Sequence, residues 1–375
     1  MSSRSVTLFR GLLPFALGAA CAKPSPPASS RPEIASQVLS PAPEGERLRA
    51  KLNDTCQRCH AQAAGEHQRS LHHVAFKDAS FQRGYVAEPQ AFCRACHAPE
   101  GDAQAEPSET AQNLGVACVT CHVTVGGTEV RSGLGRQNAR APHPVVRVAD
   151  FGTAVCAKCH EFSFPGAEGM GERGLMQKTM REHAASSRAA DSCASCHMSA
   201  KPGASSHAFA VSRDENVLRA SVAVQVEGQS PGPRTLRIAA INVGHRLPTG
   251  DMFRRLEVRF ETDVGQGDKS DKSDKSDKSD KSDKSDKSDK SDKGDRAVAV
   301  FPFERSFRAK PNEHGVMARF EASDTRISPE VATRITVPAR AKRFRLVYQR
   351  ATGVMQTPPF TPHVESETVL AEGEL

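Results

Sequence analysis

The chain is poor in aromatic residues. Among its 375 residues there is no tryptophan, there are two tyrosines, and the aromatic fraction is only 5%. So few large flat side chains give a thin packed interior, and the core needs another source of apolar surface. The composition also gives no support to a module that binds polysaccharides or partners through an aromatic-rich patch.

Long apolar runs are scarce as well, and no cysteine follows His197. The N-terminal apolar run, Gly11–Ala20, is too short to cross a bilayer stably and follows Arg4 and Arg10. This arrangement predicts a signal peptide over residues 1–21. Cysteine chemistry is confined to the first part of the chain.

The pattern Cys-x-x-Cys-His, in contrast, occurs five times and uses ten of the eleven cysteines. In this pattern the two thiols form thioether bonds to a haem, and the histidine ligates its iron. A chance match anywhere in such a chain has odds of roughly one in a hundred, so five copies predict five covalently attached haem c groups. The predicted cofactor-binding residues are Cys56, Cys59, Cys93, Cys96, Cys118, Cys121, Cys156, Cys159, Cys193 and Cys196, and the motif-side iron ligands are His60, His97, His122, His160 and His197.

The sequence predicts a mixed fold with two domains. Residues 47–210 hold every motif and predict a haem-packed, mainly α or irregular domain, with an amphipathic helix over Gly174–Ser187. Residues 211–375 alternate apolar and polar side chains, which predicts an all-β sandwich-like domain. Its expected strands are Asn216–Val226, Thr235–Val243, Arg254–Thr262, Arg296–Phe303, Val316–Ala322, Thr333–Pro338 and Arg343–Arg350, with a further one near Glu367–Ala371. Asp268–Asp295 repeats Asp-Lys-Ser/Gly and predicts a disordered insert.

Cys21 is the one cysteine outside the motifs. The run Leu17–Cys21 resembles a bacterial lipobox, with its leucine one place further from the cysteine than usual. The alternative is ordinary signal cleavage near Ala20, which leaves an exposed free thiol. We favour a lipoprotein, with residues 22–46 as a Pro/Ser-rich tether. Because thioether haem attachment takes place outside the cytoplasm, we expect an exported periplasmic protein, lipid-anchored to the outer membrane.

The formal net charge of +7 does not indicate nucleic-acid binding. Five haems bring about ten propionate carboxylates, which would reverse the sign of the charge unless some are buried and paired. We therefore expect no nucleic-acid partner.

Three further runs resemble the cytochrome c554-like multihaem family: Ser70–Ala75, Gly115–His122, and Cys193–Met198 followed by Ser206–Phe209. The resemblance covers roughly residues 50–210. It implies electron transfer through stacked haems, mostly with two histidine ligands each. It also implies that the distal ligands include His72 rather than His73, together with His143 and His207.

Two more histidines are candidate distal ligands. His183 shares a helical face with Met176 and Met180, where ligation and simple packing are equally favoured and the methionines are alternative ligands. His245 lies in the run Asn242–Asp251, which resembles a segment following the haem region in similar exported cytochromes. Ligation by His245 would join the two domains. His67, His314 and His363 are expected at the surface or beside propionates.

Two functions follow from these patterns. Five closely packed haems without open sites predict a low-potential electron-transfer protein rather than an enzyme. Its expected partners are a periplasmic or quinol-linked donor, and a terminal reductase or an acceptor across the envelope. The alternative is a reductase of the nitrite, hydroxylamine or tetrathionate type with one open haem. In that case His73, Arg246 or Asp251 would be candidate proton donors.

Overall fold

The computed structural model describes residues 43–124, 127, 129–133, 143–201, 204–209, 214–229, 231–262, 296–352 and 363–375. The predicted signal peptide, the lipobox Cys21 and the insert 268–295 lie outside the described residues. Helix α1 begins at Pro43, inside the segment predicted as a tether. None of the helices in these ranges combines the length and the apolar character that crossing a bilayer requires.

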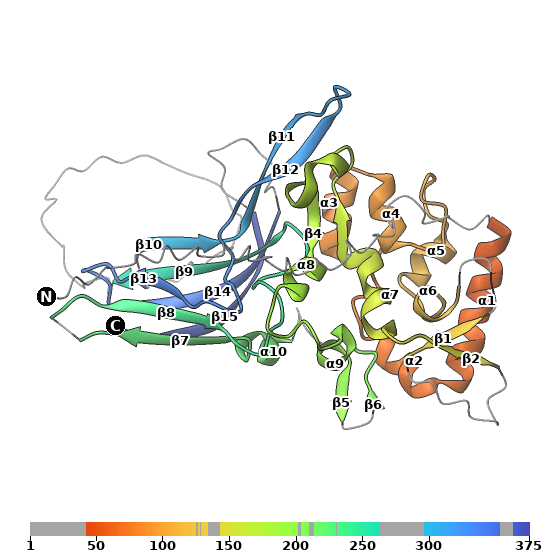
Figure 1. Ribbon diagram of the computed structural model, residues 1–375, viewed down its shortest axis with the longest axis horizontal. Coiled ribbons are helices and arrows are strands. Elements are labelled where there is room, and N and C mark those ends of the chain that lie inside the picture. Colours follow the sequence, from red (N-terminus) through yellow and green to blue (C-terminus); the bar gives the residue numbers. More distant parts are fainter. Residues whose placement is uncertain are drawn as a thin grey trace, which may run out of the picture.

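Short helices dominate residues 43–209, here called the motif half (Figure 1). Side-chain caps begin several of them: Asp78 accepts from the Ser80 and Phe81 amides, and Ser192 from the Ser195 amide. The elements are α1 (Pro43–Cys59), α2 (Ala61–His67), α3 (Ala79–Ala87), α4 (Ala91–His97), α5 (Glu109–Leu114), α6 (Cys118–His122), β1 (Val130–Ser132), β2 (Val145–Arg147), α7 (Phe151–His160), β3 (Glu161–Ser163), η1 (Glu168–Gly174), β4 (Leu175–Lys178), α8 (Thr179–Ala184), α9 (Cys193–His197), β5 (Ser199–Lys201) and β6 (Ala204–Ser205).

Antiparallel strands dominate residues 214–375, here called the strand half. A four-stranded sheet has the order β10-β9-β14-β15, and a three-stranded sheet has the order β13-β8-β7. The hairpin of β11 and β12 projects beyond them (Figure 1). The elements are α10 (Glu215–Arg219), β7 (Val222–Glu227), β8 (Thr235–Ala240), β9 (Arg254–Thr262), β10 (Arg296–Phe303), β11 (Arg305–Pro311), β12 (Met317–Asp324), β13 (Thr333–Thr336), β14 (Arg343–Thr352) and β15 (His363–Glu374).

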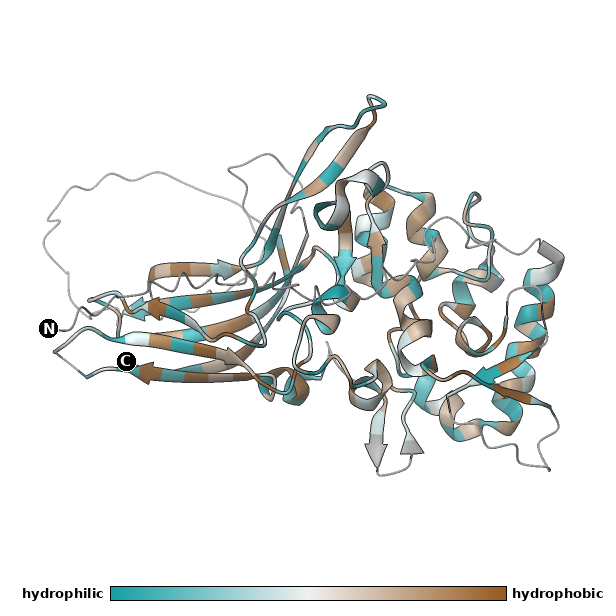
Figure 2. Ribbon diagram, viewed as in Figure 1, coloured by the Kyte–Doolittle hydropathy of each residue, from teal (hydrophilic) through white to brown (hydrophobic). Residues whose placement is uncertain are grey.

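Apolar packing is very unevenly distributed between the two halves. Eighteen buried side chains, most of them from the two large sheets, form one core in the strand half, among them Ile238, Phe260 and Leu346. Figure 2 shows these strands alternating between apolar and polar residues. The largest core cluster drawn wholly from the motif half has four buried residues, including Phe76 and Tyr85. Packing of apolar side chains is therefore enough to account for folding of the strand half. The motif half needs a further source of buried apolar surface.

Two segments differ from the sequence prediction. The helix predicted over Gly174–Ser187 is wrong in its first part, because Leu175–Lys178 forms strand β4 and pairs with β3; only Thr179–Ala184 is helical. The strand predicted over Asn216–Val226 begins only at Val222, because Asp214 caps the short helix α10 before it. The spacing of apolar residues along the chain gives no information about the Asp214 cap or about the pairing of β4 with β3.

A network of ion pairs joins the two halves. Glu182 of α8 contacts the Arg326 guanidinium, which also binds Asp324 at 2.8 Å. Lys178 lies 3.0 Å from Asp324 and 2.8 Å from Glu321. These side chains are at most 13% exposed. Because buried charges must remain paired, this network fixes how the halves dock.

Acid is expected to loosen this interface. Burial alone would raise the pKa of Asp324, but Arg326 and Lys178 outweigh it and hold the pKa well below its ordinary 3.8. A depressed carboxyl pKa contributes stability above the ordinary value, and that contribution is lost as the pH falls below it. Limited proteolysis should therefore find the junction between the halves resistant from pH 7 to about pH 5 and increasingly cleaved below about pH 4. Asp324→Asn should be cleaved there already at pH 7, and equal resistance of both proteins at pH 7 would contradict this account.

Candidate cofactor site

Each cysteine motif lies on a short helix or at the end of a longer one. Motifs 1 to 5, numbered along the chain, belong to α1, α4, α6, α7 and α9. A helical turn brings the two cysteines of a motif to one side of the helix, with the histidine next to them. All ten motif cysteines are free thiols. Helices α4, α7 and α9 bury none of their own residues, so they line space that a large flat cofactor would cover.

The fourth motif lies between the second, third and fifth. The Cys159 thiol contacts that of Cys96, and its charge acts on Cys121. Cys156 contacts Cys193 of the fifth motif. Helices α7 and α9 approach closely because residue 152 is a glycine, where an added Cβ would lie 3.0 Å from the Ala194 Cβ. The motifs therefore form one connected group rather than separate sites.

The first and third motifs are joined by buried polar contacts. Arg49 of α1 binds Glu100 and donates to the Val119 carbonyl of α6 at 2.9 Å. Glu100 also accepts from the Thr120 hydroxyl at 2.7 Å, and Asn53 accepts from the Cys118 amide at 3.0 Å. These contacts hold α6 against α1.

Removing Arg49 should strongly destabilise this contact. Glu100 is only 2% exposed, and an uncompensated buried charge costs about 3–5 kcal/mol. Arg49→Met should therefore lower the free energy of unfolding of the mature protein by that amount in denaturant titrations. Arg47→Met, which removes an exposed arginine of the same helix outside the motif, is the control. Equal stability of the two variants would contradict the assignment.

Four of the five motif histidines each face one further histidine. Their ring centres are 6.2 Å apart for His60 and His143, 6.3 Å for His160 and His72, 6.2 Å for His122 and His207, and 6.0 Å for His197 and His245. A metal–imidazole bond is about 2 Å long, so two rings on opposite sides of one metal have centres about 6 Å apart. These spacings therefore fit an iron between each pair. The second histidine of each pair is one that the sequence singled out.

Other observations also fit iron ligation. The Nδ1 atoms of His143 and His207 are buried and have no hydrogen-bond partner, a cost that a metal bond would relieve. His97 Nδ1 lies 2.7 Å from the Ala75 carbonyl and His122 Nδ1 2.8 Å from the Arg131 carbonyl. Such contacts orient a ring and direct Nε2 toward a metal. Exclusion of water lowers the pKa of His72 to about 4, with repulsion from His160 adding to it, so the ring is neutral at pH 7, the form in which a histidine can ligate a metal.

His97 of the second motif is the exception. All fourteen histidines lie in described residues, and none faces His97 at the spacing of the other pairs. Its imidazole instead stacks on Phe81 at 3.7 Å and 11°. Burial is the main cause that lowers the pKa of His97. Three charged groups also act on it: Asp251 and Arg350 of the strand half, and Asp78, which caps α3. Sequence reasoning gave no signal of this difference, because all five motifs are alike.

The remaining candidates lie apart from these pairs. His183 is beside the His197–His245 pair and against Gly244, where an added Cβ would be 3.1 Å from the His183 Cδ2, but it faces no motif histidine. Its predicted ligation stays a prediction.

Three other kinds of candidate also lie away from the pairs. Met176 packs with Phe164 and Met252, and Arg246 is 3.8 Å from Asp324. The expectation of surface exposure is confirmed for His314 and His363, which are exposed.

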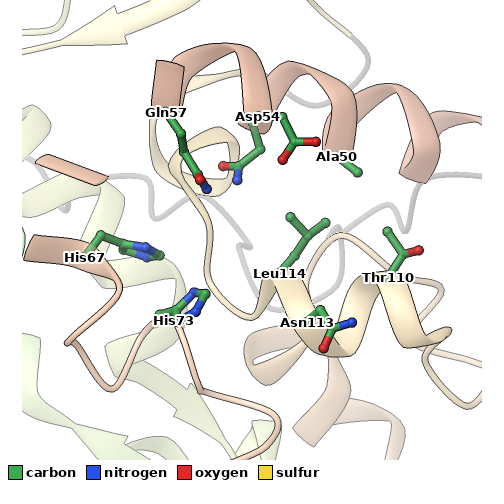
Figure 3. A pocket seen from close by; sticks show the side chains of 9 residues that line it. Ala50, Asp54, Gln57, His67, His73, Thr110, Asn113 and Leu114 are labelled. Carbon is green, nitrogen blue, oxygen red and sulfur yellow. The ribbon is translucent and has the colours of Figure 1, made fainter. Parts of the chain in front are cut away.

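His67 is buried, so of its two expected places the surface is wrong, and a place beside a propionate stays a prediction. Its Nε2 lies 2.8 Å from the Val116 carbonyl, and its ring meets that of His73 edge-on at 5.5 Å. Both imidazoles border a cavity of about 330 Å³ that faces α1 and α5 (Figure 3). The other lining residues are Ala50, Asn53, Asp54, Gln57, Thr110, Asn113 and Leu114.

One solved structure has a similar fold. It is the crystal structure of a penta-heme cytochrome c552 from Thermochromatium tepidum, with a TM-score of 0.55 and 16% sequence identity. The match covers 86% of this chain and 98% of that one. No protein family and no curated protein matches the sequence. The likeness shows a shared fold across both halves.

Proposed function

We propose that this protein is an exported pentahaem cytochrome c that carries electrons. The observation that carries the proposal is the set of four histidine pairs with ring centres 6.0–6.3 Å apart, each including a motif histidine. Bound haem supplies reversible one-electron chemistry at its iron. The paired histidines would hold four of the irons on both sides and leave no place for substrate there. The penta-haem composition of the structural neighbour supports this proposal.

The motif contacts suggest an order for the electron path. The first motif adjoins the third through the contacts of Arg49 and Asn53 with α6, and the third lies near enough to the fourth for Cys159 to raise the pKa of Cys121. The fourth motif then adjoins the second and the fifth. The proposed path is a line that branches at the fourth motif. Its external partners are the periplasmic or quinol-linked donor and the terminal acceptor expected from the sequence, with a lipid on Cys21 holding the protein at the outer membrane.

Electron paramagnetic resonance of the oxidised protein tests this proposal. Four low-spin ferric haems with two imidazole ligands each should be present, and a potentiometric titration should place them at low potential because no methionine raises it. A spectrum dominated by high-spin haem, or by histidine–methionine ligation, would overturn the proposal.

A second candidate function is ligand binding or reduction at the second motif. The observation that favours it is that no histidine faces His97. An iron held there by His97 alone would have an open face. Carbon monoxide should then bind to one haem in five of the fully reduced protein. A reduced spectrum that carbon monoxide leaves unchanged would overturn this candidate.

A further inference from the structure

We propose that Gln177 is a positioning residue for the fourth motif: its side-chain oxygen accepts a hydrogen bond from the His160 imidazole, orients that ring toward its iron and lowers the potential of the haem there. This inference rests on the proposed function, in which His160 and His72 hold one iron between them. It deepens that function by naming a group that sets the potential at the branch of the electron path.

Strand pairing places Gln177 next to the fourth motif. His160 is the last residue of α7, and β3 follows it directly. In the hairpin of β3 and β4, Gln177 lies opposite Phe162, two residues after His160. Long side chains on paired strands reach diagonal neighbours as well as the residue directly opposite. Residue 177 is thus carried to the C-terminal end of α7, where the motif histidine lies.

The side-chain oxygen of Gln177 needs a donor. This oxygen is buried, and among the described residues it has no hydrogen bond of normal geometry. Burial lowers the pKa of His160 to about 4, with the Arg254 charge next in effect, and a contact with the Gln177 side chain acts in the opposite direction. That direction identifies Gln177 as an acceptor facing the ring, because an acceptor favours the protonated imidazole. Since an unpaired buried acceptor is costly, a donor on His160 would be bound there.

Iron ligation gives the His160 ring such a donor. A neutral imidazole carries one proton, and the nitrogen that binds a metal cannot carry it. The other nitrogen is then an N–H donor, and metal-bound histidines almost always donate it to a carboxylate, a carbonyl or water. At His97 and His122 a backbone carbonyl accepts from the ring, at 2.7 and 2.8 Å. At His160 the acceptor is the side chain of Gln177, which, unlike a backbone carbonyl, can be replaced by mutation.

The strand half holds Gln177 in place through the backbone of β4. Arg305 donates to the Met176 carbonyl at 2.6 Å and to the Leu175 carbonyl at 2.5 Å. Its side chain is 2% exposed and pairs with Glu321 at 2.6 Å. A guanidinium fixed by charge-assisted hydrogen bonds restricts the residue that adjoins these two carbonyls, which is Gln177. Docking of the two halves therefore contributes to the potential of the fourth haem.

The sign of the effect follows from the hydrogen bond. An acceptor on the His160 N–H makes the ring a more basic ligand, which stabilises ferric over ferrous iron. Leucine at position 177 removes the acceptor, and glutamate replaces it with a charged one. The two substitutions should therefore shift the potential in opposite directions. A purely structural role for Gln177 would shift it the same way in both.

Redox titration of the mature holoprotein tests the inference. Gln177→Leu should raise the potential of one haem, changing its oxidised-to-reduced ratio at a fixed potential roughly 2- to 10-fold, the worth of a neutral hydrogen bond. Gln177→Glu should lower it by roughly tenfold in the same ratio, about 59 mV for one electron. The haem concerned is the one whose potential His160→Met raises. The matched control is Gln225→Leu, which replaces an exposed glutamine of β7 and should shift no potential.

Electron paramagnetic resonance of the same samples separates the inference from the function on which it rests. Wild-type protein without four low-spin haems overturns the proposed function and the inference with it. Four low-spin haems with potentials that are equal in all variants, or that shift the same way in both, overturn the role of Gln177 alone, as does a shift confined to another haem. Should Gln177→Leu fail to retain five haems, Gln177→Glu, which matches glutamine in size, decides: a lowered potential supports the inference, and an unchanged or raised one overturns it.

Discussion

Replacing both thiols of the fourth motif should remove one haem and divide the electron path. In the variant Cys156→Ser/Cys159→Ser, intact mass should show four haem additions. Because the fourth motif adjoins the second, third and fifth, its loss separates the first and third motifs from the other two. After photoreduction of the protein, the fast phase in which electrons equilibrate among haems should be lost between these groups.

The matched control removes a haem from the end of the path. Cys56→Ser/Cys59→Ser also leaves four haem additions, yet the remaining motifs stay connected and their fast phase should persist. His160→Met adds a variant that keeps both thioethers and should raise the potential of the fourth haem. Identical kinetics in the two cysteine variants would contradict a branch at the fourth motif.

Without haem attachment, the motif half should unfold while the strand half stays folded. The strand half has its own core of eighteen buried residues, including Leu256 and Phe344. The motif half has clusters of only four and three buried residues, and most of its helices are too short to be stable alone. Haem binding and folding of this half are therefore coupled, as in small metal-dependent domains.

Hydrogen exchange on chain produced without the haem-attachment machinery measures this directly. Amides of β9 and β14 should remain protected, and those of α4, α6 and α9 should exchange as in an unfolded chain. The mature protein is the control, in which both halves should be protected. Protection of α4, α6 and α9 without haem would show that side chains alone fold the motif half.

The sequence was most informative where chemistry or periodicity is local. The spacing within each Cys-x-x-Cys-His motif does not depend on the fold, so all ten thiols could be named. The strands expected at Arg254–Thr262 and Arg296–Phe303 are found with those bounds, because alternation over nine and eight residues is a strong signal. The four histidines brought opposite the motifs were also named in advance, three from a family resemblance that no match has confirmed.

Features that depend on distant partners were not predicted. Strand β11 was missed because Arg305–Pro311 is rich in charge, and only its pairing with β12 makes it a strand. Likewise, Met176 was assigned to a helical face, whereas its segment pairs with β3. The action of Asp251 and Arg350 on His97 arises from docking of the two halves. No local pattern encodes that arrangement.

Intact mass of the denatured mature protein tests the central claim most directly. The account predicts five haem additions that remain with the polypeptide under denaturing conditions, because each is held by two thioether bonds. Four or fewer additions, or haem that separates from the chain on denaturation, would contradict it.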